Sequence, residues 1–184
     1  MTKRRKHDPV TTDFPFPPPV LGTWRPLTEG QRQRWLIAAC NRHFKWLRRR
    51  GPRDAPAGTV FRIEGADVDN LPGLLCALGE AVNGPGGYFG GLNALSLQDC
   101  LFGSFGVTLP FAIHITNVET ARRNLGGGAL ATWAQRRLRA EDFLDAEGEQ
   151  WLRDAERSGR EGTATLLDTI LDVLRDHGVS IEGP

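Results

Sequence analysis

The sequence predicts a small α/β protein in which a three-stranded parallel sheet is packed with helices. Three short apolar segments rich in branched residues, near 59–65, 109–116 and 179–181, are typical of strands. Segments with three-and-four apolar spacing separate them, and strands joined by helical crossovers run parallel with right-handed connections. The length of 184 residues suits one compact core with appendages better than two full domains.

The N-terminal segment, 1–58, is expected to be a proline-rich arm followed by a helix. Prolines at 9, 15, 17, 18, 19 and 26 favour polyproline II in the arm and exclude helix there. Thr28 and Gln31 form a helix-start pair, and apolar residues then recur at helical spacing. An amphipathic helix over 28–50 is therefore predicted, ending at Gly51-Pro52.

The remaining residues, 59–184, are expected to form the α/β domain. In chain order we predict a strand at 60–65, a helix at 71–82, a second helix at about 88–102, a strand at 109–116 and a short helix at 117–125. Three glycines at 126–128 are predicted to stop that helix. A charged helical insert at about 126–162 then holds one or two amphipathic helices, before a helix at 163–177 and a strand at 179–181.

The net charge of +1 conceals an uneven distribution. Residues 1–58 carry thirteen Lys/Arg against four Asp/Glu, whereas residues 59–120 carry one against six and residues 121–184 nine against twelve. The chain is a basic arm joined to an acidic body, and such asymmetry indicates partners rather than fold.

Several function classes find no support in the sequence. The N-terminus lacks an apolar stretch of signal-peptide length, and no apolar run approaches the roughly 20 residues that span a bilayer, so a cytoplasmic protein without membrane contact is expected. The three cysteines show no CxxC spacing, and no GxSxG, P-loop or HExxH motif occurs. We predict no enzyme, cofactor or metal site. His114 is expected to be a structural residue of its strand, and His177 to cap helix carbonyls.

The segment Gly86-Gly-Tyr-Phe-Gly-Gly-Leu-Asn-Ala-Leu-Ser-Leu-Gln-Asp-Cys-Leu resembles the barstar family, the small intracellular inhibitors of barnase-like ribonucleases. The shared pattern is a Tyr-(Tyr/Phe)-Gly loop, a Leu-Asp-Ala-Leu helix turn and Asp-Cys-Leu. The similarity covers roughly residues 59–125 and 163–182, and leaves the arm and the insert without counterparts.

The resemblance implies a barstar-like fold and an inhibitor or immunity protein, expected to be monomeric, that occludes a ribonuclease or toxin with a basic active-site cleft. Seven residues would contact that partner: Tyr88, Phe89, Gly90, Asn93, Ser96, Asp99 and Asp176. Asn93 stands where the family commonly has an acidic residue. Its separation of six residues from Asp99 corresponds to 600° on a helix, so the two would not share a face.

Alternatives remain for several of these residues. Asp99 is also consistent with a solvated helix carboxylate, and Tyr88 with a loop residue packing over Gly90. Phe102 and Phe105 are expected to cover the core beside the Asp-Cys-Leu turn. Tryptophans at 24, 35 and 46 alternate with cations in the N-terminal segment. They either stack on nucleic-acid bases or anchor the arm to the body. The alternative function is therefore a regulatory interaction module whose basic segment 1–58 binds nucleic acid or an acidic partner.

Overall fold

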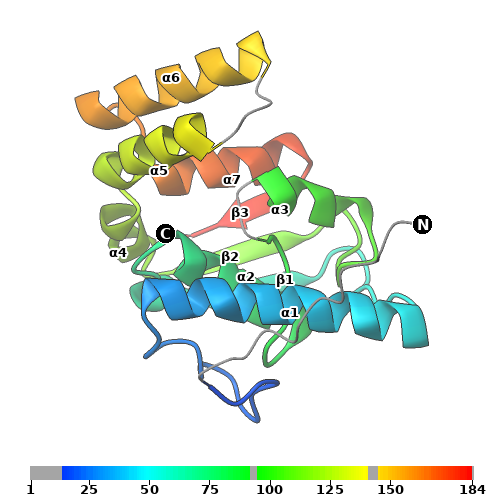
Figure 1. Ribbon diagram of the computed structural model, residues 1–184. Helices are drawn as coiled ribbons and strands as arrows, with labels where there is room; N and C mark the ends of the chain where they lie inside the picture. The colour runs from blue at the N-terminus through cyan, green and yellow to red at the C-terminus, as the bar shows by residue number, and fades with distance from the viewer. Residues whose placement is uncertain (1–13, 92–94, 141–144, 184) are drawn as a thin grey trace, which may run out of the picture.

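A parallel three-stranded sheet organises the computed structural model, which describes residues 14–91, 95–140 and 145–183 (Figure 1). The strands are β1 (Val60–Glu64), β2 (Ala112–Thr116) and β3 (Ser180–Glu182), in the spatial order β1-β2-β3. Val60 pairs with Ala112, which pairs in turn with Ser180. The side chains of the central strand are largely buried because helices cover the faces of a parallel sheet, and Ile113 and Ile115 lie in the core. The predicted fold class is confirmed.

The helices occupy the segments between and before the strands. They are α1 (Glu29–Arg50), α2 (Leu71–Asn83), α3 (Leu95–Asp99), α4 (Val118–Asn124), α5 (Gly127–Ala140), α6 (Ala146–Glu161) and α7 (Leu166–Asp176), with 3₁₀ turns η1 (Gly65–Asp67) and η2 (Cys100–Phe102). Side-chain caps define where several helices begin. At the start of α1, the Thr28 hydroxyl accepts from Gln31 N, and the Gln31 side chain accepts from Thr28 N. The helix predicted at 28–50 is confirmed.

Two predicted boundaries differ from the structure for local reasons. The strand predicted at 109–116 begins only at Ala112, because Pro110 has no N–H to donate to a neighbouring strand. The helix predicted at 88–102 is reduced to α3 and η2. Gly90 has a φ of +75°, which no right-handed helix contains, and a Cβ there would lie 2.5 Å from Leu97 Cδ1. Gly90 therefore fixes a tight loop in front of α3.

The charged insert forms the helices α5 and α6, which pack closely against each other (Figure 1). The three glycines at 126–128 are predicted to end the preceding helix. Helix α4 does end at Asn124, but the next helix, α5, already begins at Gly127. A Cβ on Gly127 would lie 2.4 Å from the Gly159 carbonyl oxygen, and a Cβ on Gly159 would lie 2.6 Å from that of Gly127. These glycines therefore permit a backbone-to-backbone contact between the two helices.

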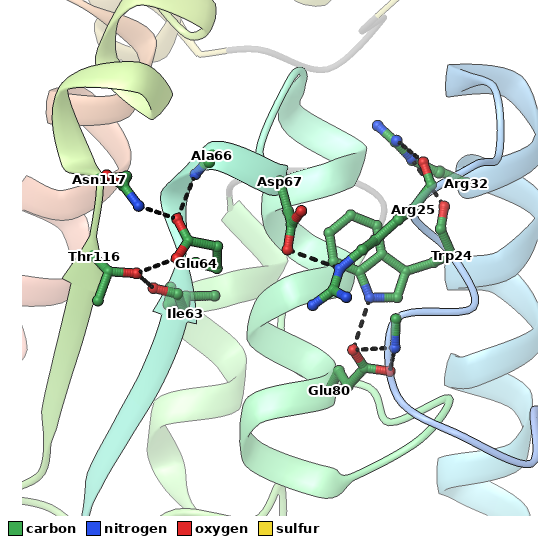
Figure 2. A network of polar contacts seen from close by, with 11 residues as sticks. Trp24, Arg25, Arg32, Ile63, Glu64, Ala66, Asp67, Glu80, Thr116 and Asn117 are labelled. Atoms are coloured by element: carbon green, nitrogen blue, oxygen red, sulfur yellow. Dashed lines mark hydrogen bonds and ion pairs between the residues drawn. The ribbon is translucent and has the colours of Figure 1, made fainter.

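The described part of the arm is fixed to the domain by a polar network (Figure 2). The Glu80 carboxylate on α2 accepts from Gly22 N at 2.9 Å and from Trp24 Nε1 at 3.0 Å. The Arg32 guanidinium, only 3% exposed, pairs with Asp69 and donates to the Trp24 carbonyl. Residues 22–25 are thereby held against α1 and α2.

One hydrophobic core includes both the N-terminal segment and the α/β body. Trp24 and Trp35 are 2% and 1% exposed, and they belong to the same cluster as Leu75 of α2 and Ile113 of β2. Trp24 and Trp35 therefore anchor the N-terminal segment to the body and are not available to stack on nucleic-acid bases. No helix in the described ranges combines the length and the apolar character needed to cross a membrane.

Candidate partner-binding site

The short helix α3 and the turn η2 divide their side chains between core and surface. Leu97, Cys100 and Leu101 point inward and are at most 4% exposed. The Cys100 thiol accepts from Gly90 N at 3.2 Å, which ties the turn to the preceding loop. Asp99 is exposed, and Phe102 is 77% exposed. Burial of one side of this segment therefore presents a carboxylate and an aromatic ring to solvent.

A hydrogen bond joins this segment to the C-terminal end of α7. Gln98 Nε2 lies 3.0 Å from His177 Nε2, and His177 Nδ1 lies 2.8 Å from the Val173 carbonyl oxygen. Because a carbonyl only accepts, Nδ1 carries the ring proton, and Nε2 accepts from the Gln98 amide. The predicted role of His177 in capping a helix carbonyl is thus confirmed.

The two predicted carboxylates are the chain neighbours of the residues in this contact. Asp99 is the chain neighbour of Gln98, and Asp176 is the chain neighbour of His177. Both carboxylates are exposed, and neither has an ion-pair partner among the residues that the structure describes. The Phe102 ring meets the His177 ring edge-on, with centroids 6.1 Å apart. We call Gln98, Asp99, Phe102, Asp176 and His177 the α3–α7 patch.

The loop before α3 is not part of that exposed surface, which corrects the expectation for three residues. Tyr88 is 6% exposed, Phe89 is fully buried, and Gly90 is buried as well. The Tyr88 ring packs against the His43 ring of α1, with centroids 5.8 Å apart. Helix α1, which has no counterpart in the barstar pattern, packs over Tyr88, whereas Phe89 packs against Phe111 and Gly90 lies close to Leu97. Burial raises the pKa of Tyr88, so the phenol stays protonated.

The two remaining predicted residues are Asn93 and Ser96. Asn93 lies outside the described residues. Ser96 is half-buried, and its hydroxyl accepts from Gly91 N at 2.9 Å, an interaction that fixes the loop end. Among the seven predicted residues, Asp99 and Asp176 are exposed and adjoin the Gln98–His177 hydrogen bond.

Sequence analysis missed Gln98 and misplaced Phe102, which was expected to cover the core. Their position depends on the turn from α3 into η2, and no periodicity over so few residues reveals that turn. The one available signal is the placement of Phe102 directly before Gly103, whose φ of +92° ends the turn.

The titratable groups of the described chain suggest no metal or thiolate chemistry. No group of three or more His, Cys, Asp or Glu side chains is arranged to hold a metal ion within the described ranges. The cysteines are free thiols, and burial raises the pKa of Cys100 to about 12. Cys76 is also buried, which raises its pKa further. These two thiols are therefore protonated at neutral pH and pack as small apolar groups.

Comparisons with protein-family models, with curated proteins and with solved structures find no match for this chain. The candidate site therefore stands on the residues and contacts described above.

Proposed function

We propose that this chain is a barstar-like inhibitor or immunity protein that occupies the active-site cleft of a basic ribonuclease or related toxin, without turnover. The observation that carries the proposal is the 77% exposure of Phe102 within a patch that also holds the unpaired carboxylates of Asp99 and Asp176. An exposed ring with flanking acids is suited to contact a cationic protein surface.

The chemistry of the target explains why such a patch suits inhibition. A ribonuclease of this kind presents Lys and Arg to an RNA phosphate, so carboxylates occupy the place of phosphate and an aromatic ring the place of a base. The acidic balance of residues 59–120, one basic residue against six acids, adds an opposite potential that accelerates encounter.

The contact set we propose differs from the one that the resemblance implies. It is centred on α3, η2 and the end of α7, because α1 covers Tyr88. The Gln98–His177 hydrogen bond holds the two halves of the patch together before a partner arrives, so little ordering is needed on binding.

Calorimetry with purified ribonucleases tests the proposal. We would titrate the protein with barnase and with ribonuclease toxins encoded beside its gene, and follow RNA cleavage in parallel. Asp99→Ala is expected to weaken the complex by about 2–5 kcal/mol, the usual effect of removing a buried charge from an ion pair. Phe102→Ala is expected to weaken it by about 2 kcal/mol or more.

Glu161→Ala is the matched control, because Glu161 is an exposed carboxylate on α6 outside the patch. It should leave the affinity unchanged. A tight complex that tolerates Asp99→Ala would show that the patch is not the interface. Absence of binding and inhibition with every ribonuclease tested would refute the function itself.

A further inference from the structure

A cavity of about 320 Å³ lies between the C-terminal half of α1 and the loop that follows α2. Its lining includes Arg42, His43 and Trp46 from α1, Arg53 from the segment after it, and the backbone of Gly86 and Gly87. The cavity therefore combines two guanidinium groups with an indole and an imidazole, and it shares no residue with the α3–α7 patch.

The face of α1 next to this cavity is cationic and lacks carboxylate partners. Arg42, Lys45 and Arg49 follow one another at helical spacing and are exposed, so they share a face that extends over about 10 Å of helix. Residues 30–53 contain no Asp or Glu. In the described chain, no ion pair involves these three residues or Arg53.

Neutral contacts hold the cations at the cavity without cancelling their charge. Arg42 Nη1 donates to the Pro85 carbonyl at 2.9 Å, which fixes its guanidinium at the rim. The Arg53 guanidinium lies over the Trp46 ring, 5.7 Å from its centroid. Both arrangements leave a positive group free to pair with an anion.

Aromatic rings accompany these cations. Trp46 is half-buried and lines the cavity together with the His43 ring. Rings that alternate with Lys and Arg are the means by which proteins bind single-stranded nucleic acid, since bases stack on the rings and phosphates pair with the cations. An acidic protein would use the cations but has no need of the ring-lined cavity.

We propose that the α1 face of Arg42, Lys45, Trp46 and Arg49, together with Arg53, binds single-stranded nucleic acid. Phosphates pair with the four cations, and a base enters the cavity beside Trp46. Bases in a duplex are already stacked on one another, so the site selects strands whose bases are free. This binding goes beyond the proposed inhibition and uses a separate surface.

Fluorescence anisotropy with a labelled 12-nucleotide oligo-U tests the inference on the full chain. Four phosphate contacts predict a slope of about −2.8 for log affinity against log salt, and hence about a 50-fold loss of affinity between 50 and 200 mM salt. The triple variant R42Q/K45Q/R49Q should bind more weakly and reduce the slope by about 2. Trp46→Leu should lower the affinity about 5- to 150-fold and leave the slope unchanged.

The triple variant R153Q/R157Q/R160Q on α6 removes the same number of exposed charges and is the matched control. It should bind oligo-U as the unmodified protein does, with circular dichroism confirming that all variants are folded. Equal weakening by both triple variants would overturn the site. Tighter binding of a 12-base-pair duplex, or equal competition by polyglutamate, would overturn the preference for single strands.

Each of the two proposals can be refuted without affecting the other. Asp99→Ala should leave oligo-U binding intact, because Asp99 belongs to the α3–α7 patch. No oligo-U binding at 50 mM salt would refute the nucleic-acid site whatever the ribonuclease measurements show.

Discussion

The Glu80 carboxylate fixes the arm through three hydrogen bonds. Its oxygens accept from the backbone of Gly22 and from the indole of Trp24, a side chain that is 2% exposed. Glu80→Ala would leave these N–H groups without their acceptor in a partly buried position. We expect the free energy of unfolding to fall by about 1–3 kcal/mol, measured by urea denaturation.

Glu161 is the control for Glu80, because its carboxylate has no such hydrogen bonds among the described residues. Glu161→Ala removes an exposed side chain and should change the free energy of unfolding by less than about 0.5 kcal/mol. If the two variants were equally stable, Glu80 would not fix the arm.

Glu64 predicts a pH dependence at the ends of β1 and β2. Its carboxylate accepts from Ala66 N, from Asn117 Nδ2 and from Thr116 Oγ1 (Figure 2), and these hydrogen bonds lower its pKa. A lowered pKa in the folded state stabilises the fold above the unfolded pKa, and this contribution disappears as the pH falls through the folded value. Stability should therefore decline at acidic pH.

Glu64→Gln isolates this contribution. The variant should be less stable than the unmodified protein at pH 7, and the difference in stability should shrink as the pH falls through the lowered pKa of Glu64 in the folded state. Urea denaturation at pH 7, 5, 4 and 3 measures it. A difference that is constant with pH would contradict the assignment.

Part of the candidate site was predictable from single residues. The exposed Asp99 and Asp176 follow from polar positions on helices, and a resemblance to barstar singled them out. The burial of Tyr88 was not predictable, since it depends on where α1 lies, and nothing in the loop sequence reveals a helix more than thirty residues upstream.

At the level of elements, the contact between α5 and α6 depends on two glycines. A Cβ on Gly159 would lie 2.6 Å from the backbone oxygen of Gly127 and 2.8 Å from Ala131 N, and neither backbone atom has room to move. The clash of the added methyl group in Gly159→Ala should therefore cost about 1–3 kcal/mol. The higher helix propensity of alanine offsets about 1 kcal/mol of this cost. Thermal unfolding measures the net loss.

Gly128→Ala is the matched control in the same hairpin. Gly128 lies in α5, and no described atom lies within 4 Å of the position of an added Cβ. The variant should gain up to about 1 kcal/mol, because alanine favours helix over glycine. Stabilisation by both substitutions would show that the helices are not in close contact.

The helix boundaries show which parts of the secondary structure apolar periodicity predicts correctly. The helices α2 and α7 begin and end close to their predicted limits, because strong apolar stripes and caps at Asn70 and Thr165 define them. The helix predicted at 88–102 is confirmed from Leu95 onward as α3 and η2, but its beginning is wrong because it includes the left-handed Gly90, which packs against Leu97. Local propensity is a weak guide where a tertiary contact selects the backbone conformation.

For the whole molecule, the shared core predicts that residues 59–184 do not form a stable fold without the N-terminal segment. Removing 1–58 deletes Trp24 and Trp35, which are nearly fully buried. Truncation of a buried tryptophan typically costs about 3–5 kcal/mol, and two such losses approach the 5–15 kcal/mol that stabilise an ordinary domain.

Dispersion of amide signals in a proton–nitrogen NMR spectrum tests this prediction. The fragment 59–184 should show poor dispersion and rapid proteolysis, whereas the full chain should show neither. A well-dispersed, protease-resistant fragment would mean that the arm and α1 form an appendage.

The order of strands and helices, the fold class and the division of charge are predictable from the sequence, because periodicity, capping and composition are local properties. Which of the predicted contact residues reach the surface depends on tertiary packing. Burial depends on what packs above a residue: α1 covers Tyr88, whereas nothing comparable covers Phe102. The same helix exposes Arg42, Lys45 and Arg49, the cations of the nucleic-acid site that we propose.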